Sequence, residues 1–460
     1  MKDRTKEAQE KEERLGTMPV GRLIATMSLP MMVSFFIQAL YNIVDSIFVS
    51  RISENALTAV SLAYPMQMVA HAIAVGIGVG INASVPRYLG KGEPEKARRA
   101  AGNAFSLDFV VWMFFLVLGL TAVPSIYRAQ TDVAEIVEDG SVYLSICWCI
   151  LCGEMFGQFF EKLLVASGQP VLAMVSQSSG AIFNIVFDPL LIFGIGPFPE
   201  MGIAGAAAAT VGGQILAAAV SFILNVRRNG TSMFGPKDLL FDGQTLRELL
   251  GVGFPTMITI GLTSVTGFCI NQVLLGYSTT AAAVYGIWVK LQNFCMMPLF
   301  GMNNGLVPIL SYNNARNLQT RVWETVRIAL TFAICLMSVL TVVLELIPGP
   351  ILRLFSASGT MMEIGVTALR WCILSLPFGG VCIILTSTMQ SLQHSRYTLL
   401  INILRQLVFI ISLFVLISAI THQLSAVWAA VPCAEALSCV TAVHFEKIMY
   451  RDLHGKEKNS

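Results

Sequence analysis

The chain alternates between long apolar stretches and short polar connections. A helix needs about 20 apolar residues to cross the hydrocarbon core of a bilayer, and twelve stretches reach that length. They lie near residues 22–50, 56–86, 100–124, 133–158, 166–194, 202–226, 246–274, 279–310, 321–347, 361–391, 396–419 and 423–449. The pattern predicts an all-α membrane protein with twelve transmembrane helices.

The twelve spans form two sets of six with the same punctuation. Leu29-Pro30 opens the first set and Phe254-Pro255 the second, and Gly168-Gln169 before span five is matched by Gln393-His394 before span eleven. Because six is even, both sets start on the same side, as parallel repeats about an axis along the membrane normal do. We therefore expect a cytoplasmic leader, a first six-helix lobe, a cytoplasmic linker, a second six-helix lobe and a cytoplasmic tail, over residues 1–17, 18–227, 228–246, 247–450 and 451–460.

Composition and charge agree with this picture. The chain is 55% hydrophobic and 13% charged, against roughly 25% charged residues in a soluble domain. A net charge of +2 gives no reason to expect a nucleic-acid partner. Cations gather in the even-numbered connections, for example Arg87 and Lys91 after span two and Arg227 and Arg228 after span six. The positive-inside rule then places both termini in the cytoplasm.

Ten cysteines are scattered through the apolar stretches. We expect small buried side chains rather than disulfides, because no pairing pattern is visible. Cys147, Cys149 and Cys152 are close in sequence, but no histidine or second cysteine pair follows at zinc spacing. The sequence predicts no cofactor.

Two aspartates, Asp45 and Asp188, lie inside apolar spans. A carboxylate in hydrocarbon costs at least about 2.5 to 3.5 kcal/mol without a partner or water, which makes each one a functional-site candidate. Both lie about 8 to 9 Å from the outer end of their helix at 1.5 Å per residue, with Asn42 and Asn184 one turn earlier. Equal depth allows a shared cavity that takes up a proton or, with amide and hydroxyl oxygens, a sodium ion. Alternatively, each acid only hydrogen-bonds a neighbouring helix.

Other polar residues in the spans are weaker candidates for a functional site. Thr210 and Gln214 lie four apart on span six, where a close helix contact explains Thr210 as well as ion ligation does. Lys290, expected to be buried in span eight, is a counter-charge, a substrate-sensing group or part of a structural ion pair. We expect Glu154 and Glu161 near the inner end of span four, where they reach water. Helix-to-helix hydrogen bonding is the expected use of His71, Asp108, Glu345 and Glu435.

Methionines are abundant where two lobes would face one another, and a soft lining suits a promiscuous pocket, although lipid-facing methionine is equally reasonable. The expected substrate-cavity residues are Gln38, Tyr41, Asn42, Met66, Gln214, Met257, Lys290 and Met297.

The chain resembles the multidrug and toxic compound extrusion (MATE) transporters over roughly residues 18–450, most closely the bacterial branch with MepA-like members. The resemblance rests on the order and spacing of seven segments, 29–30, 42–45, 86–92, 100–104, 168–170, 184–188 and 202–210. It implies that Asp45, Asn184, Asp188 and Thr210 bind the coupling proton or sodium ion. Acids that other members carry in spans seven and ten are absent here.

These observations predict a monomeric antiporter in the bilayer of a bacterial inner membrane. It would export small organic cations in exchange for protons or sodium ions. A lipid-linked oligosaccharide flippase of related fold is the main alternative, but an anionic headgroup needs several cations in the cavity and the sequence offers chiefly Lys290. An intramembrane enzyme needs a nucleophile with a base, or a metal cluster, and the spans show neither. Twelve spans in duplicate are a poor match to a receptor.

Overall fold

The computed structural model describes residues 14–228, 234–355, 357 and 359–457. The predicted leader up to residue 13, part of the predicted linker (229–233) and the last three residues of the predicted tail lie outside this range. The described chain is helical throughout, without a strand. Ten helices are long and apolar enough to span a membrane, and two further helix pairs bring the number to twelve if each pair forms one span. The predicted all-α fold is confirmed, and the predicted twelve spans are reached when each bent pair is counted as one span.

Spans four and ten are each broken. Ala134–Cys149 meets Cys152–Ala166 at a bend of 41°, and Gly359–Ile373 meets Leu376–Ser391 at the same angle. The predicted end of span four, near residue 158, was therefore wrong, because the second helix of the pair continues to Ala166.

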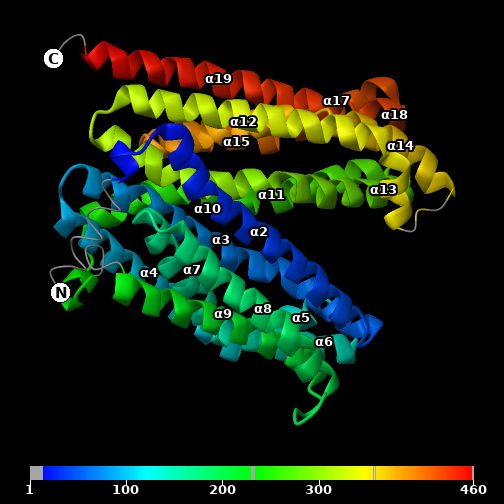
Figure 1. The fold of residues 1–460 in the computed structure, drawn as a ribbon. Coiled ribbons are helices and arrows are strands. Elements are labelled where there is room, and N and C mark those ends of the chain that lie inside the picture. Colours follow the sequence, from blue (N-terminus) through cyan, green and yellow to red (C-terminus); the bar gives the residue numbers. More distant parts are fainter. Residues whose placement is uncertain (1–13, 229–233, 356, 358, 458–460) are drawn as a thin grey trace. The chain divides into compact units, whose positions relative to one another are not determined.

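The chain divides into two compact units, of which the first comprises residues 1–257 and 304–319. Within it, α8 packs between α2 and α9, and α3 packs against α4, α6 and α7 (Figure 1). Its elements are α2 (Val20–Ser50), α3 (Glu54–Gly90), α4 (Pro94–Thr121), α5 (Val123–Arg128), α6 (Ala134–Cys149), α7 (Cys152–Ala166), α8 (Pro170–Phe193), α9 (Gly202–Arg228), η1 (Pro236–Leu239), the start of α10 (Gly243–Leu275) and the end of α11 (Thr279–Ala315).

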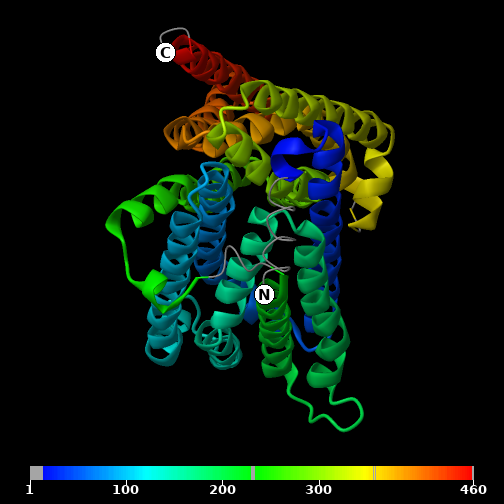
Figure 2. The same cartoon turned by 60° about the vertical axis from the view of Figure 1, so that its left-hand side comes forward.

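The second unit comprises residues 258–303 and 320–460. Here α15 and α17 pack along α19, the long C-terminal helix drawn in red in Figure 2. Besides the remainder of α10 and α11, the unit contains α12 (Gln319–Leu346), α13 (Pro348–Leu354), α14 (Gly359–Ile373), α15 (Leu376–Ser391), α16 (Ser395–Ile403), the π-helix η2 (Leu404–Phe409), α17 (Ile410–Thr421), α18 (Leu424–Val427) and α19 (Ala430–Glu457).

The repeat is also visible in the backbone. Gly92 and Gly168 adopt left-handed conformations with φ of 73° and 76°, and Asn317 and Gln393 do so with φ of 58° and 66°. Asn317 follows Gly92 along the chain at the same interval as Gln393 follows Gly168. Non-glycine residues rarely adopt positive φ. The second half therefore keeps the turn geometry of the first half even where glycine has been replaced.

Two glycines let α8 and α9 approach closely. A Cβ on Gly180 would lie 2.6 Å from the carbonyl oxygen of Gly213, and a Cβ on Gly213 would lie 2.6 Å from the carbonyl oxygen of Gly180. Contacts between small residues are a common way to bring membrane helices together. This contact lies one turn from Asn184 on α8 and one turn from Thr210 on α9, so it sets the separation of those two side chains.

We expect Gly213→Ala to destabilise the protein by about 1 to 3 kcal/mol, because the added methyl group overlaps backbone that cannot rotate away. The matched control is Gly251→Ala in α10, where a Cβ meets nothing within 4 Å. The measurement is the thermal unfolding midpoint of both purified variants in detergent. Equal midpoints would show that the α8–α9 contact tolerates a side chain.

The segment that leads into α10 is docked on α4. The Asn103 amide donates to the carbonyl oxygens of Asp238 and Leu240 at 3.2 and 3.0 Å, and the Asp242 backbone amide donates to Asn103 Oδ1 at 2.7 Å. A Cβ on Gly102 would lie 2.3 Å from the Asp238 carbonyl oxygen, so glycine is needed for this approach. The predicted linker is thus held against the first unit over these described residues.

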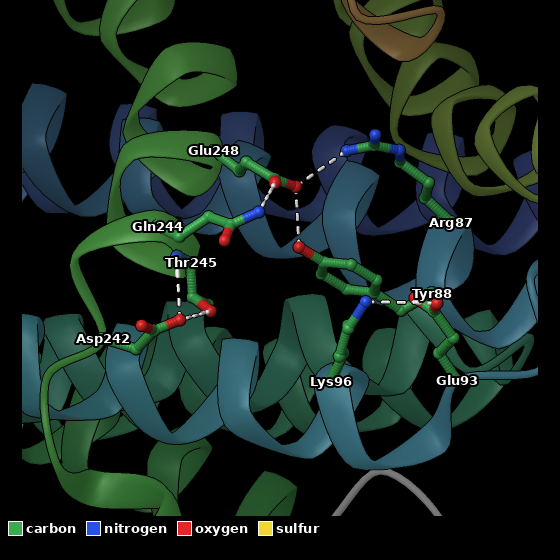
Figure 3. A network of polar contacts seen from close by, with 8 residues as sticks. All are labelled: Arg87, Tyr88, Glu93, Lys96, Asp242, Gln244, Thr245 and Glu248. Carbon is green, nitrogen blue, oxygen red and sulfur yellow. Dashed lines mark hydrogen bonds and ion pairs between the residues drawn. The ribbon is translucent and has the colours of Figure 1, made fainter.

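Polar contacts also anchor the first turns of α10 (Figure 3). The Asp242 carboxylate accepts hydrogen bonds from the hydroxyl and the backbone amide of Thr245. These bonds hold the pKa of Asp242 below its usual range. One turn further, Glu248 Oε2 accepts from Arg87 Nη1 at 3.0 Å and from the Tyr88 hydroxyl at 2.7 Å. The Arg87-Tyr88 pair at the end of α3 is therefore tied to the start of α10.

Candidate functional site

The two aspartates singled out by the sequence lie next to each other. Asp45 is on α2 and Asp188 is on α8, and these helices pack together. Their carboxyl groups are within hydrogen-bonding reach of one another. Asp188 is fully buried and Asp45 is half-buried. Two carboxyl groups at this distance hold a proton between them or share a cation, since two bare negative charges repel at short range.

Asn184 joins the acid pair to α9. It lies four residues before Asp188 and hence on the same face of α8. Its amide nitrogen is 3.3 Å from Asp188 Oδ1 and 3.4 Å from Thr210 Oγ1, to both of which it donates. The structure thus brings Asp45, Asn184, Asp188 and Thr210 into one cluster, which we call the acid cluster.

Three oxygens of the acid cluster are buried and accept no hydrogen bond from the described part of the chain. They are Asp45 Oδ1, Asp188 Oδ2 and Asn184 Oδ1. A buried acceptor without a donor costs about 1 to 3 kcal/mol, and a proton or a small cation would satisfy it. Over the same residues no group of three or more His, Cys, Asp or Glu side chains converges. Carboxylate, amide and hydroxyl oxygens suit hard cations rather than transition metals.

A row of polar side chains follows α2 towards the acid cluster. The Ser34 hydroxyl donates to Gln177 Oε1, and Gln177 Nε2 donates to Gln38 Oε1 at 3.2 Å. Gln38 in turn hydrogen-bonds the Tyr41 hydroxyl, which interacts electrostatically with both aspartates. Positions 34, 38, 41 and 45 recur at helical spacing on one face of α2. Gln38 and Tyr41, predicted as cavity residues, therefore belong to the surroundings of the acid pair.

A small cavity of about 20 Å³ lies beside Thr210, enough for roughly one water molecule. Gln214, a predicted cavity residue, lines it together with Gln67 and Glu154. Glu154 Oε1 lies 2.7 Å from His71 Nδ1. The expectation that Glu154 lies near the inner end of span four was wrong, because Glu154 lies in the first turn of α7, which continues to Ala166.

Glu161 was expected to reach water, and this expectation was wrong. It is 5% exposed and pairs at 3.1 Å with Lys162, which is 4% exposed. Lys162 Nζ also donates to Asn304 Oδ1 at 2.9 Å. Sequence reasoning missed Lys162 altogether. The available signal was an acid and a base side by side within the apolar run from Phe159 to Leu164.

The remaining predicted cavity residues differ in exposure and in what they contact. Asn42 is exposed, Met66 packs on an apolar core cluster, and Met257 packs where a Cβ on Gly76 would fall. In the second unit, Met297 is half-buried. Lys290 is exposed and takes part in none of the ion pairs between described residues, so the expectation of a buried lysine was wrong.

Several single ionisable residues do bond between helices, as expected. His71 bonds Glu154, and Glu435 bonds Arg405, which the sequence analysis did not single out. Asp108 is buried with Oδ1 unbonded among the described residues, and Glu345 is half-buried. All ten cysteines are free, but Cys335 and Cys433 are exposed, so the expectation of burial was wrong for these two.

The model of the MatE family matches residues 30–190 and 255–416, which is most of the chain. The chain belongs to the MATE family. Multidrug export protein MepA of Staphylococcus haemolyticus is 28% identical over 396 residues, 85% of each chain. The FAD transporter of Shewanella oneidensis is 25% identical over 407 residues, 86% of this chain and 87% of that protein.

Solved structures share the MATE fold. A multidrug resistance MATE family transporter in an outward-facing conformation superposes with a TM-score of 0.90 at 22% identity, covering 96% of this chain and 98% of that one. A variant of the Vibrio cholerae MATE transporter VcmN superposes with a TM-score of 0.86 at 21% identity, covering 94% and 97%. Membership of the MATE family makes this protein a multi-pass membrane transporter rather than an enzyme.

Proposed function

We propose that this protein is a secondary active exporter of organic cations, driven by inward movement of protons or sodium ions through the acid cluster. The observation that carries the proposal is the pairing of Asp45 with Asp188, whose carboxyl groups are in contact and retain buried oxygens that accept no hydrogen bond from the described residues. The similarity to MepA, named as a multidrug export protein, supports the same direction of transport.

The coupling follows from one conformational equilibrium. A proton or sodium ion neutralises the paired carboxylates and favours the conformation in which that charge is buried, whereas an organic cation favours the conformation in which the carboxylates are ionised. Each ligand shifts the equilibrium only by its difference in affinity for the two conformations. Ion and drug then exchange without occupying the transporter together.

One of the comparisons supports an anionic substrate as the second candidate. The FAD transporter covers nearly the whole chain at an identity close to that of MepA. An anionic substrate, whether a dinucleotide or the headgroup of a lipid-linked oligosaccharide, needs guanidinium or ammonium groups with free donors. The aspartates around which the site is built favour cations instead, so a cationic substrate is the proposal and transport of FAD is the outcome that would replace it.

We further propose a bacterial inner-membrane location, a monomer in the bilayer and cytoplasmic termini. The charge pattern supports this orientation, since the connections after even-numbered spans carry most of the cations. The two six-helix repeats, at 18–227 and 247–450, would form two lobes with the substrate path between them.

The experiment that tests the proposal uses the full chain reconstituted in vesicles at a fixed membrane potential. Ethidium, tetraphenylphosphonium and FAD are supplied in parallel, and either the pH gradient or the sodium gradient is collapsed in turn. We expect export of the two cations to stop when one of the gradients is removed. Export that ignores both gradients, or that is confined to FAD, would contradict the proposal.

A further inference from the structure

The second unit contains a buried ion pair at the meeting point of η2 and α19. Arg405 Nε and Nη2 both donate to Glu435 Oε1, at 3.0 and 2.8 Å. The Arg405 side chain is 19% exposed and that of Glu435 is 10% exposed. The other carboxylate oxygen, Glu435 Oε2, is buried and accepts no hydrogen bond from the described residues. The guanidinium group thus neutralises the carboxylate as a bound cation would. Only one of the two carboxylate oxygens accepts its hydrogen bonds.

This pair occupies the part of the repeat that corresponds to the acid cluster. By the interval that separates Gly168 from Gln393, Asn184 corresponds to Phe409 at the end of η2, and Arg405 lies about one helical turn before Phe409. The connection that follows is shorter in the second half, because α18 begins soon after α17 ends, whereas residues 194–201 separate α8 from α9. Counted from Gly202 and Leu424, where the next helices begin, Glu435 lies about one turn beyond the position of Thr210. The arginine and the glutamate therefore lie about one helical turn from the places that Asn184 and Thr210 hold in the first half.

The local backbone supports a specialised role. Residues Leu404–Phe409 form a π-helix, whereas α8 is a regular α-helix over its whole length. Short π-helical turns occur often at functional sites. Two contacts from α10 hold this turn, since the Thr266 hydroxyl donates to the Gln406 carbonyl oxygen at 2.6 Å and Asn402 Nδ2 donates to Thr259 Oγ1 at 2.8 Å. The backbone on either side of Arg405 is therefore tied to α10.

We propose that the Arg405–Glu435 pair is a second cation site in which the guanidinium group replaces an exchangeable ion. The tethered cation neutralises Glu435 throughout the transport cycle, so only the first half takes up a proton or a sodium ion. This role in coupling rests on the proposed function of the acid cluster. The capacity to bind a small monovalent cation once the arginine is removed does not depend on it.

The titratable groups that face Glu435 are Arg405 and the thiols of Cys382 and Cys439. Thiols ordinarily ionise near pH 8.5, so measurements at pH 6 to 7 keep the carboxylate as the group that responds. Gly379 of α15 lies against the pair, since a Cβ there would be 3.5 Å from Glu435 Oε2 and 3.6 Å from Arg405 Nη2.

The first measurement is the thermal unfolding midpoint of the full-length protein in detergent as methylguanidinium chloride is added. Tetramethylammonium chloride serves as the control for ionic strength. We expect the midpoint of Arg405→Ala to rise with methylguanidinium and to saturate, while wild type and Arg405→Ala/Glu435→Gln do not respond. The double variant is the matched control, because it removes the guanidinium without leaving a negative charge. An equal response of the single and double variants would overturn the proposal.

The second measurement separates a replaced ion from a merely structural ion pair. The number of protons or sodium ions displaced on binding of tetraphenylphosphonium is measured by titration calorimetry in buffers of different ionisation enthalpy and at two sodium concentrations. We expect Arg405→Ala to displace one more cation per bound molecule than wild type, and the double variant to match wild type. A purely structural pair would leave that number unchanged in Arg405→Ala, which would also overturn the proposal.

The two proposals fail in distinguishable ways. If Asp188→Asn transports drug with normal coupling, the acid cluster is not the coupling site, and the methylguanidinium response of Arg405→Ala still decides whether the second unit holds a cation site. If the acid cluster proves essential but Arg405→Ala responds like the double variant, the second-unit proposal alone is wrong.

Discussion

Asp188→Asn is expected to abolish ion-coupled drug efflux while leaving the protein folded. The asparagine keeps the size of the side chain and its bond with Asn184, but it removes the charge that the coupling ion neutralises. A hydrogen bond to a charged partner is worth about 1.5 to 3 kcal/mol, so the affinity for the coupling ion should fall by about tenfold or more. Asp45→Asn should have the same effect, because the two carboxyl groups act as a pair.

Efflux of ethidium from cells or vesicles with an imposed ion gradient measures this loss. The matched control is Asp132→Asn, which removes a carboxylate from an exposed position in the connection before α6. Asp188→Glu restores the charge and should recover part of the activity. Near wild-type coupled efflux in both Asp45→Asn and Asp188→Asn would end the hypothesis that these carboxylates carry the coupling ion.

Glu161→Gln is expected to have the largest effect on stability. It would leave the Lys162 ammonium group buried with only neutral amide oxygens as partners, and loss of one charge of a buried ion pair typically costs about 3 to 5 kcal/mol. The double variant Glu161→Gln/Lys162→Met should be considerably more stable than the single variant, because no uncompensated charge remains inside.

Denaturation midpoints in detergent measure both variants. Glu93→Gln provides the control, since it breaks an exposed pair in which Lys96 and Glu93 are 59% and 37% exposed, and such pairs are worth about 1 kcal/mol or less. A loss for Glu161→Gln no larger than that for Glu93→Gln would show that water reaches the Glu161–Lys162 pair.

Much of the architecture can be predicted from the sequence. Transfer of a segment into hydrocarbon depends mainly on its own composition, which is why the number of spans and their approximate positions follow from the sequence. The breaks at 150–151 and 374–375 were not foreseen, because the apolar run continues across them. Whether a helix bends there depends on the neighbours that satisfy the freed backbone groups.

Some residues of the candidate site can likewise be predicted from the sequence, and others only from the structure. An acid in an apolar stretch is conspicuous, so Asp45 and Asp188 are identified from sequence, and helical spacing assigns Asn184 to the face of Asp188. Glu161 was misjudged because a charge near the end of a predicted span looks as if it reaches water. Lys162 and Arg405 were not predicted as site residues, whereas the helix-to-helix bond of Glu435 was expected. Their burial is a property of the helices packed around them.

The sequence by itself determined that this protein is helical, spans a membrane repeatedly, consists of two related halves and carries two acids in the first. Only the tertiary structure decided that the two carboxyl groups meet, that Thr210 joins them through Asn184, and that the second half has an arginine paired with Glu435. Hydrophobicity acts on each segment separately, whereas these contacts depend on how neighbouring helices turn their faces towards one another. The rotation of each helix about its own axis is set by packing, such as the close approach of α8 and α9 at Gly180 and Gly213. The spacing of residues along the sequence does not specify this rotation.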